Sequence, residues 1–583
     1  MDFQTKHISR LAVSLLAAAG AATSVGAGVI IPPQLQTDAA YRVVAYTGQA
    51  APGGGVWTEF GLPAMSETGR VAFVGEVQGI LIQTGIWSEG HSGAGNLQPV
   101  VREFQSVPSL TPMTYGEFQS IFHTPVMSES GDIAFGVPLV GNSVTDNSDR
   151  GVLRHIGGQL EVVALPFWPA PGGGLFESIT NLPSMNNVGE VVFHSSLIGG
   201  GVQESNNSGV YRDGAGPTEL VFREGDAIAS MPNSFMGGVS GLIMSINDNG
   251  VVGLQNWYSD NGQGRWSTWR AEPGGMSLSD LIARQNDASP AGPVYGGGLF
   301  GLGQVSINNA GDAVFAQTAA LGTPVETGVW LDQNGVESAV GHWGMAGPLG
   351  IEFRSVYPFT NAINGDGRVV FRSTIDAPGF QNGDSGLFYR DGAGAAQIVA
   401  IAGQAAPSMP AGVEFGHGDN FTMVAINNNG RIAYQAHIDG PGIMNDNDFA
   451  LWVSRGSFGD ADLVLYEGQN MSVGGQLRTI NNYNYIIGAG PESGRRASFN
   501  DNNQVALRVN FTDNTSAIIV ATVAALCAGD LNGDGIVDGA DLATLLALWG
   551  ACGDEFCAAD LNLDGQVNGA DLASLLAVWG PCP

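Results

Sequence analysis

A nine-residue pattern of alternating apolar and polar positions recurs along the chain as far as residue 520. The first three copies occupy residues 65–73, 127–135 and 185–193. Each begins with an apolar residue, continues through a polar turn with Gly at the fifth position, and ends on Phe. Gly, often preceded by Asn or Asp, supplies the positive φ that a tight turn requires, and the apolar positions on either side predict two strands. Each copy therefore predicts a β-hairpin.

The copies are spaced almost evenly, which is seen from the residue at their fifth position. These eight residues are Gly69, Gly131, Gly189, Gly250, Gly311, Gly367, Gly430 and Asn503. The intervals between them are nearly equal, and only the last, from Gly430 to Asn503, is clearly longer. A period near 60 that is held over eight copies predicts a repeated structural unit.

Each unit contains signals for further strands. A Gly followed by an apolar pair, as in residues 85–87, 209–212 and 328–330, marks one strand, and a run such as 161–165 or 219–223 marks the next. The stretch before each turn completes four strands. Units of four antiparallel strands repeated around a ring are typical of a β-propeller, which leaves only short edges unpaired. We therefore predict an all-β fold, a β-propeller whose loose eighth copy leaves eight or seven four-stranded blades open.

These repeats resemble two known sequence patterns. The nine-residue pattern resembles the tandem Asn-x-x-Gly-x-x-x-Ala-Phe repeats of exported bacterial proteins of unassigned function, and the resemblance spans residues 41–522. A weaker likeness is to the Asp-box of sialidase propellers, seen in residues 245–250, where Asn stands at the Asp position and the Trp is missing. That box is a structural hairpin, so neither resemblance implies an active site.

Residues 527–583 contain a second duplication. The stretch from Asp530 to Asp541 aligns with the stretch from Asp560 to Asp571. Both copies fit a calcium loop with oxygen ligands at positions 1, 3, 5, 9 and 12, a backbone carbonyl at position 7, and Gly at position 6. The predicted ligands are Asp530, Asn532, Asp534, Ile536, Asp538 and Asp541 in the first loop, and Asp560, Asn562, Asp564, Gln566, Asn568 and Asp571 in the second. Hard carboxylate and amide oxygens favour calcium over softer metals.

A helix is predicted after each loop. Leu542, Leu545, Leu546 and Trp549 form one apolar stripe, and the same stripe recurs in the second copy. Position 12 is Asp rather than Glu, and no helical pattern precedes either loop, so we predict a pair of loop–helix units rather than complete EF-hands. The nine acidic residues of the module repel one another and no basic residue offsets them, so we expect calcium binding and folding of the module to be coupled.

This C-terminal module resembles a type I dockerin over its whole length. The resemblance implies two bound Ca²⁺ ions and attachment to a cohesin-like or other extracellular protein, in the setting of secreted polysaccharide degradation. Loop positions 10 and 11 are Gly539–Ala540 and Gly569–Ala570, where cohesin-binding dockerins usually carry Ser or Thr, and the Lys–Arg pair of such helices is missing. Calcium binding therefore carries over, whereas recognition of a cellulosome-type cohesin does not.

The first 27 residues predict a secretory signal peptide. Lys6 and Arg10 precede an apolar run over residues 11–22, and a small-residue cleavage site ends at Ala27. Neither this run nor any later one is long enough to span a bilayer. The four cysteines, Cys527, Cys552, Cys557 and Cys582, all lie in the C-terminal module. In an exported chain they predict two disulfides, with three pairings open. We therefore expect a secreted or cell-surface protein with a signal peptide (1–27), a propeller (28–526) and a calcium module (527–583).

Composition and charge exclude several functions. Of the 583 residues, 87 are Gly, 28 are Pro, 44% are hydrophobic and only 13% are charged, which fits many short strands and excludes coiled coils and helical arrays. The net charge of −32 and the single Lys argue against nucleic-acid binding, which needs clustered basic residues. Removal of the signal peptide takes away one acidic and two basic residues, so the mature charge becomes −33.

No catalytic or cofactor-binding residue is assigned. The seven histidines of the mature chain show no metal-ligand spacing, and no Gly-x-Ser-x-Gly elbow is present. Arg154, Arg212 and Arg390 recur at one position of the unit and predict a packing role rather than an anion clamp. Five glutamates recur near the start of the second strand, where a structural role is also favoured; they are Glu59, Glu117, Glu177, Glu352 and Glu414.

The sequence thus predicts an exported calcium-binding scaffold whose propeller binds a polysaccharide or protein ligand and whose C-terminal module attaches to an extracellular partner. The alternative is a polysaccharide-degrading, glycoside hydrolase-like enzyme with an active site at a propeller mouth. Such an enzyme needs two carboxylates about 5 to 10 Å apart. A carboxylate pair at the mouth would favour the enzyme.

Overall fold

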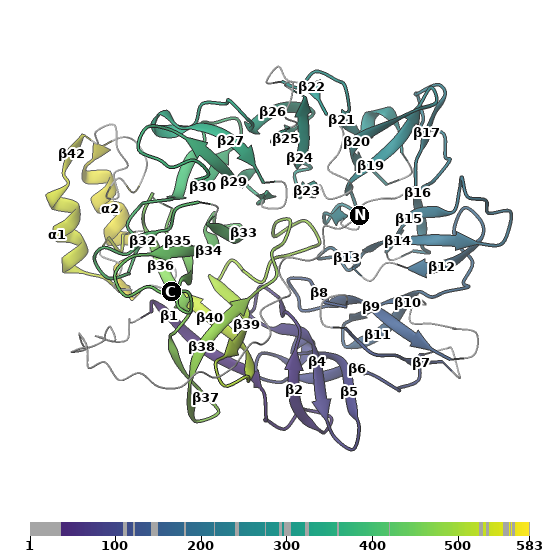
Figure 1. The fold of residues 1–583 in the computed structure, drawn as a ribbon, viewed down its shortest axis with the longest axis horizontal. Coiled ribbons are helices and arrows are strands. Elements are labelled where there is room, and N and C mark those ends of the chain that lie inside the picture. Colours follow the sequence, from purple (N-terminus) through teal and green to yellow (C-terminus); the bar gives the residue numbers. More distant parts are fainter. Residues whose placement is uncertain are drawn as a thin grey trace, which may run out of the picture.

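Eight antiparallel sheets, each of five strands, surround a central axis in the computed structural model (Figure 1). The structure describes residues 37–108, 113–119, 123–141, 150–179, 182–214, 216–238, 244–273, 276–290, 294–296, 305–320, 326–357, 361–418, 420–456, 458–523, 529–531, 536–551, 559, 561 and 566–581. The predicted β-propeller is confirmed, and of the two blade numbers left open, eight is the correct one.

In the first seven blades the innermost strand is broken into two short pieces, both of which pair with the next strand, and two more strands follow outward. This is why the predicted four strands are counted as five. Blade by blade the strands are β2 (Val56–Phe60), β3 (Ala64–Met65), β4 (Val71–Gln78), β5 (Ile82–Ser88), β6 (Gln98–Arg102); β7 (Thr114–Tyr115), β8 (Val126–Met127), β9 (Ile133–Val140), β10 (Arg150–Ile156), β11 (Gln159–Ala164); β12 (Leu175–Ile179), β13 (Ser184–Met185), β14 (Val191–Ile198), β15 (Ser208–Asp213), β16 (Glu219–Arg223); β17 (Ser234–Met236), β18 (Ser245–Ile246), β19 (Val252–Asp260), β20 (Gln263–Ala271), β21 (Leu281–Arg284); β22 (Val294–Tyr295), β23 (Val305–Ile307), β24 (Ala313–Ala320), β25 (Glu326–Gln333), β26 (Val336–Gly341); β27 (Glu352–Val356), β28 (Ala362–Ile363), β29 (Arg368–Asp376), β30 (Ser385–Asp391), β31 (Gln397–Ile401); and β32 (Glu414–Phe415), β33 (Phe421–Ile426), β34 (Ile432–Asp439), β35 (Phe449–Ser454), β36 (Ala461–Tyr466).

The eighth blade joins the two ends of the propeller sequence. It contains β37 (Asn470–Val473), β38 (Gln476–Asn484), β39 (Gln504–Phe511) and β40 (Ser516–Val523), and its outermost strand is the N-terminal β1 (Ala39–Tyr46). Strand β1 pairs with β40 from Ala39 opposite Val523 to Tyr46 opposite Ala517. The ring is therefore closed by hydrogen bonds between the first and the last strand of the propeller, and neither edge of the repeat array is left open.

The recurring pattern lies at the turn between the inner strand and the second strand of each blade. In blade 4, Asn247 accepts a hydrogen bond from the backbone of Gly250, which has φ 77°, and the chain then reverses into β19. The predicted hairpin is confirmed. The last residue of the pattern, which is aromatic in six blades and Leu254 or Leu507 in the other two, packs in the blade core. In blade 6 the ring of Phe371 lies 5.4 Å from Phe353 and 5.5 Å from Phe388.

The Gly that stands two residues before most aromatics of the third strand has a steric cause. A Cβ on Gly386 would lie 2.6 Å from the ring of Phe388, and one on Gly328 would lie 2.5 Å from Trp330. In these blades the aromatic side chain thus folds back over its own strand, and Gly leaves the space for it. Blades 4 and 7 place Ser267 and Ala450 at the same position before their Trp.

The recurring arginines tie neighbouring blades together. Arg154 donates to the carbonyl of Gly189 at 3.1 Å, and Arg212 donates to that of Gly250 at 2.7 Å. Each acceptor is the turn glycine of the following blade. Arg390 instead donates to backbone carbonyls of Ala339 and Gly394. All three arginines therefore have the structural role that their recurrence predicts.

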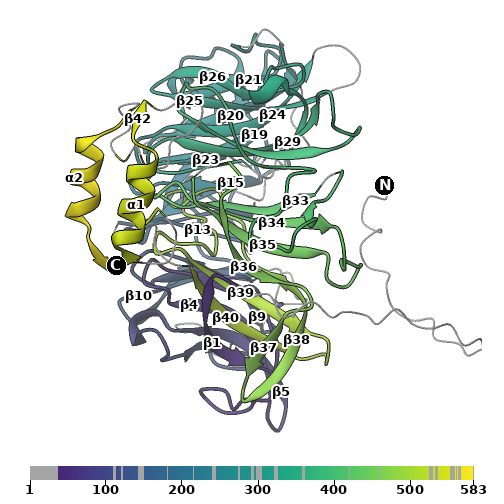
Figure 2. The ribbon, with the colours of Figure 1, turned by 90° about the vertical axis from the view of Figure 1, so that its left-hand side faces the viewer.

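Two helices, α1 (Gly539–Ala547) and α2 (Gly569–Ala577), lie at the rim of the ring and are displaced to one of its faces (Figure 2). They are framed by short pairs, β41 (Ile536–Val537) with β44 (Gly580–Pro581) and β42 (Gly550–Ala551) with β43 (Gln566–Val567). Three 3₁₀ turns complete the described elements, at Gly90–Ser92, Leu278–Asp280 and Pro348–Gly350. Among the described residues no helix is long and apolar enough to cross a membrane.

Only one side chain of the predicted apolar stripe of each helix is completely buried, while Leu542 and Leu572 pack partly buried against it. Leu545 and its counterpart Leu575 are 0% exposed, whereas Leu546 and Trp549 keep 51% and 49% of their surface exposed. The two nine-residue helices pack along one narrow line, which leaves the flanking positions of the predicted stripe outside the core.

Candidate calcium centre and central plug

Each predicted calcium loop ends on a completely buried aspartate. Asp541 and Asp571 are both 0% exposed. Oδ1 of Asp541 accepts the backbone N–H of Leu531 at 2.7 Å, and Oδ2 accepts that of Asp538 at 2.8 Å. Asp571 repeats both bonds at 2.8 Å, with the N–H groups of Leu561 and Asn568. The carboxylate therefore ties the beginning of its loop to the start of the helix.

The ninth loop residue begins the helix. Oδ1 of Asp538 accepts the N–H of Ala540 at 2.8 Å, and Oδ1 of Asn568 accepts that of Ala570 at 2.8 Å. Both side chains are N-caps, which satisfy a donor that the first turn of a helix leaves free. Loop and helix are consequently one unit, and a distortion of the loop is transmitted to the helix.

The described residues of the two loops fit a divalent cation. A carboxylate that is buried without a counter-charge is unfavourable, and this module has no basic side chain to supply one. Oxygen-only donors favour Ca²⁺. The described members of the predicted ligand set are Asp530, Ile536, Asp538, Asp541, Gln566, Asn568 and Asp571, while Asn532, Asp534, Asp560, Asn562 and Asp564 lie outside the described residues. Both ligand sets stay predictions.

A chain of asparagine hydrogen bonds runs around the propeller through the recurring turns. Each Asn at the second position of the pattern accepts the N–H four residues on in its own turn, as Val251 donates to Oδ1 of Asn247, and donates through Nδ2 to the matching carbonyl of the next blade. The donors and acceptors are Asn186 to Asn247 (2.8 Å), Asn247 to Asn308 (2.9 Å), Asn308 to Asn364 (3.2 Å), Asn364 to Asn427 (3.2 Å), Asn427 to Asn500 (3.0 Å) and Asn500 to Ser66 (3.1 Å).

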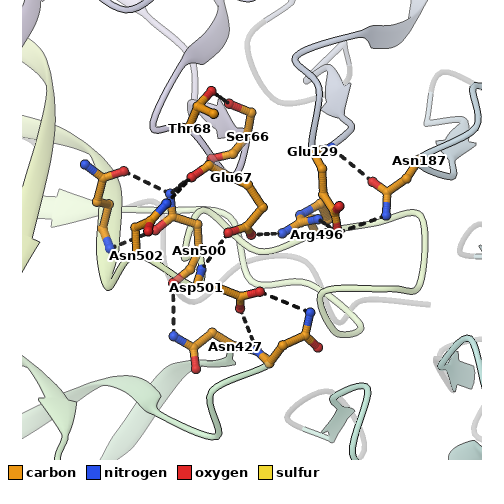
Figure 3. A network of polar contacts seen from close by, with 12 residues as sticks. Ser66, Glu67, Thr68, Glu129, Asn187, Asn427, Arg496, Asn500, Asp501 and Asn502 are labelled. Carbon is orange, nitrogen blue, oxygen red and sulfur yellow. Dashed lines mark hydrogen bonds and ion pairs between the residues drawn. The ribbon is translucent and has the colours of Figure 1, made fainter. Parts of the chain in front are cut away.

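Blades 1 and 2 lack this link because their turns carry Ser66 and Ser128 instead of Asn. The gap is bridged by Arg496, which lies in the long connection between β38 and β39. Its Nη1 donates to Glu129 at 2.9 Å and its Nη2 donates to Glu67 (Figure 3). The guanidinium thus joins the two turns that serine cannot join.

The segment 486–498, which contains Arg496, is called the central plug below. Its backbone carbonyls accept the N–H groups of Met185, Ile246 and Ile363 from blades 3, 4 and 6, at 2.9, 3.0 and 3.3 Å. Glu492 accepts the N–H of Asn309 at 2.7 Å. The equivalent residue of the next blade is Gly365, which has no side chain that could accept this N–H. The plug therefore caps inner edges of several blades and fills the irregular positions of the ring. In the sequence, the plug is indicated by the longer interval between the last two copies of the repeat.

Burial dominates the electrostatics of the plug. It raises the pKa of Glu67, where Arg496 acts in the opposite direction and Asp501 adds to the rise. It likewise raises the pKa of Glu492. Burial lowers the pKa of Arg495 to about 10. Arg496 itself is 4% exposed in its side chain, so it is the buried counter-charge of two carboxylates.

A pocket of about 220 Å³ lies between blades 1 and 2. It is lined by Glu59 and Glu117, two of the five recurring glutamates, together with Glu76 and Thr84. The Oγ1 of Thr84 accepts the N–H of Phe118 at 2.7 Å and so joins the two blades at the pocket wall. Glu59 belongs to an inner strand and Glu117 directly follows one, so their predicted position near the start of a second strand is wrong: the inner strand comes first in each blade. The structure brings these two together and places Glu177, Glu352 and Glu414 elsewhere.

The histidines do not converge on a common site. Within the described ranges no three His, Cys, Asp or Glu side chains are arranged to hold a metal ion. Burial lowers the pKa of both His123 and His194 to about 4, so these two rings are neutral at physiological pH.

One buried carboxyl group titrates close to neutrality. Burial and the neighbouring Asp448 raise the pKa of Glu467 from its ordinary value of 4.5 to about 7. Glu467 is 8% exposed, and Asp448 also lies 3.2 Å from Nε2 of His437. Because the folded state holds the proton of Glu467 more tightly than the unfolded chain does, the stabilisation from that proton is complete below the ordinary pKa. It is lost as the pH rises from there through about 7.

We expect Glu467→Gln to stabilise the protein at pH 8 by about 1–2 kcal/mol, a value reduced for partial solvent screening. The amide imitates the protonated acid, so the advantage of the variant over the wild type should shrink as the pH falls from 8 toward 5. Urea unfolding at both pH values measures the difference. The exposed Glu204→Gln is the control, and a variant that is less stable than wild type at pH 8 would contradict the assignment.

Several sequence predictions fall outside the described residues. The signal peptide (1–27) is one of them, and so are all four cysteines, whose disulfides stay a prediction. The boundaries of the propeller (28–526) and of the calcium module (527–583) also remain predictions.

Comparison with known proteins identifies both parts of the chain at the family level. A model described as a family of unknown function, DUF7453, matches residues 82–527, and the type I dockerin domain model matches residues 528–577. No curated protein matches the chain.

Solved structures with a similar fold are distant. Pyrococcus horikoshii acylaminoacyl peptidase is 10% identical, with a TM-score of 0.32, over 79% of this chain and 52% of its own. A polysaccharide lyase described as PL25 ulvan lyase is 10% identical, with a TM-score of 0.30, over 72% and 96%. A Dyadobacter fermentans protein of unknown function is 10% identical, with a TM-score of 0.26, over 69% and 93%. The chain spans about half the length of the peptidases it matches.

Proposed function

Because the chain belongs to DUF7453, a family of unknown function, and carries a type I dockerin domain, we propose a function from its sites. The protein is an exported calcium-binding scaffold. Its propeller carries a ligand-binding surface, and its C-terminal module attaches it to a cohesin-type extracellular partner. The observation that carries this proposal is the pair of buried aspartates, Asp541 and Asp571, in a module without basic side chains. Each of them belongs to a loop that leads directly into a helix.

The proposal also assigns a role to the N-terminal segment, the calcium loops and the cysteines. Residues 1–27 direct export and are removed, two Ca²⁺ ions occupy the loops of residues 527–583, and two disulfides clasp this small module, whose described core holds few fully buried apolar side chains. Each ion would be held by the six predicted ligands of its loop. Attachment is therefore calcium-dependent, since the metal stabilises the helices that follow the loops.

The propeller's ligand is tested with the mature protein, in calcium, on a panel of insoluble polysaccharides. Retention on a polysaccharide without release of reducing ends supports a carbohydrate-binding scaffold. Absence of both retention and release from all of them points to a protein ligand. Loss of the module's calcium-dependent attachment to every cohesin tried would contradict the scaffold itself.

The pocket between blades 1 and 2 favours a second candidate, a polysaccharide-degrading enzyme. It gathers Glu59, Glu117 and Glu76, and glycoside hydrolysis uses a pair of such groups. If the pocket is an active site, reducing ends appear, and Glu59→Gln or Glu117→Gln lowers their release by at least about 100-fold. Glu352→Gln, at a recurring position outside the pocket, is the matched control. Equal release by all variants would contradict this function.

A further inference from the structure

Arg495 and Arg496 are neighbours in the central plug, but only one of them is neutralised. The guanidinium of Arg496 pairs with the carboxylates of Glu67 and Glu129. Arg495 pairs with no carboxylate of the described residues, and its one side-chain hydrogen bond within these ranges runs from Nη1 to the carbonyl of Leu182 at 3.4 Å. Most N–H groups of this guanidinium therefore have no acceptor in the described part of the chain.

The Arg495 side chain runs from the plug along the inner strand of blade 3. The carbonyl of Gly494 accepts the N–H of Met185 at 2.9 Å, whereas Nη1 of Arg495 reaches Leu182, three residues earlier in that blade. The guanidinium thus lies away from the turn that follows Met185, while that of Arg496 reaches two such turns. Figure 1 shows the connection between β38 and β39, which carries both arginines, in the middle of the ring. The charge of Arg495 is therefore placed inside the propeller.

The position of Arg495 is unfavourable for a charge that stays without a counter-ion. Burial lowers its pKa to about 10, and no neighbouring charge contributes to this shift, so the guanidinium is still protonated at neutral pH. An enclosed cation without a partner destabilises a fold. The residue nevertheless keeps part of its surface accessible, so a small molecule can reach it. An anionic ligand would supply the missing counter-charge.

A purely structural arginine of this propeller has a different set of contacts. Arg390 has no carboxylate partner among the described residues either, but it donates to the carbonyls of Ala339 and Gly394 and to the hydroxyl of Ser338. Acceptors of the protein itself thus hold its guanidinium in place. Arg495 has a single long bond instead, so its remaining donors are available to a ligand.

The charge of the whole chain restricts the kind of ligand. A guanidinium favours a carboxylate or a sulfate, because its planar N–H groups match two oxygens of such a group. The protein carries 54 acidic against 22 basic residues, for a net charge of −32, so it repels a polyanion. A ligand that enters the ring therefore carries one oxyanion on an otherwise neutral body.

We propose that Arg495 binds the single oxyanion, a carboxylate or a sulfate, of a small and otherwise neutral ligand inside the propeller. This inference rests on the ligand-binding role proposed for the propeller and specifies the chemical group that is recognised. The bound oxyanion accepts paired N–H groups of the guanidinium and neutralises its charge.

Calorimetric titration of the full mature chain in calcium tests this anion site with two probes, galacturonate for the carboxylate and inorganic sulfate for the sulfate. Galactose is the neutral control. We expect binding of at least one anion and none of galactose, and Arg495→Met should weaken the binding at least about 10-fold. Binding of galacturonate alone identifies a carboxylate ligand, and binding of sulfate alone identifies a sulfated one.

Arg354→Met is the matched control for the loss of a positive charge. It breaks an exposed ion pair with Glu352 and Asp376, and it should bind both probes like the wild type. Equal binding by the wild type and R495M, or no binding of either probe, would overturn the anion site.

The stability of R495M without probe separates ligand binding from a structural role. Its urea midpoint should be at least as high as that of the wild type, because an enclosed charge without a partner is removed. A lower midpoint would make Arg495 a structural residue and overturn the anion site. All these failures would leave the scaffold proposal standing, because polysaccharide retention and attachment of the C-terminal module are measured without the probes.

Discussion

Replacing Arg496 by Met destabilises the propeller by about 2–4 kcal/mol, because a buried ion pair that loses one partner costs up to about 5 kcal/mol when the other charge stays buried and unpaired. Here the side chain of Glu67 is 20% exposed and that of Glu129 is 43% exposed, so water compensates part of the loss. Methionine keeps most of the buried volume, which limits the effect to charge and hydrogen bonds. The free energy of unfolding from urea titration measures it.

The loss should be local at first. Arg496 connects blades 1 and 2 at the position where the asparagine chain is interrupted, so the plug should show faster hydrogen exchange in residues 486–498 before the outer strands change. Arg354→Met is the matched control, because its partners Glu352 and Asp376 are 43% and 60% exposed, and such pairs contribute about 1 kcal/mol or less. Equal destabilisation by the two variants would show that Arg496 is not a structural bridge.

A second variant separates charge from packing. In R496M/E67Q the carboxylate that loses its partner is replaced by a neutral amide, whose oxygen can still accept the N–H of Asp501, which Glu67 accepts at 3.0 Å. We expect this double variant to regain part of the stability that R496M loses, since the two residues are directly coupled.

The sequence was sufficient for the repeating part of the fold. A turn such as 247–250 needs a side chain that accepts a backbone N–H of the same turn, which is Asn247 here and Ser66 or Ser128 in blades 1 and 2, and it needs Gly to adopt positive φ. Both requirements are local, so they recur along the repeat. The Phe of the pattern, and the Gly before aromatics such as Trp330 and Phe388, are likewise fixed by contacts within one blade. Because these contacts lie within one blade, the residues that make them recur with the period of the repeat. This is why the strands of each blade could be predicted from the sequence.

The irregular parts could not be predicted in the same way. Arg496, Glu492 and Glu67 come from different parts of the ring and meet only after it closes, so no spacing along the chain reveals them. Glu467 has a raised pKa because of its burial beside Asp448, which again depends on tertiary packing. The exposure of Leu546 and Trp549 was missed because helical periodicity places residues on a face but does not determine how wide the buried part of that face is.

Removal of calcium should unfold the C-terminal module while the propeller stays folded. Asp541 and Asp571 are held inside their loops by two backbone hydrogen bonds each, and no basic side chain of the module compensates for them. Without Ca²⁺ the buried carboxylates and the seven other acidic residues repel one another. The core between the helices, formed around Leu545 and Leu575, is too small to resist this repulsion.

Hydrogen exchange of the full chain measures the effect directly. In excess chelator, peptides covering residues 536–551 and 566–581 should lose at least about 100-fold in protection, whereas β29 in the propeller should not change. Asp541→Asn preserves the shape of the side chain but only one of its two acceptor oxygens, and it removes one charge. It should therefore weaken calcium binding and melt the first repeat at calcium concentrations that keep the wild type folded. Asp513→Asn, at an exposed turn of the propeller, is the control. If both helices kept their protection in chelator, the loops would fold without metal, and the buried aspartates would be structural caps alone.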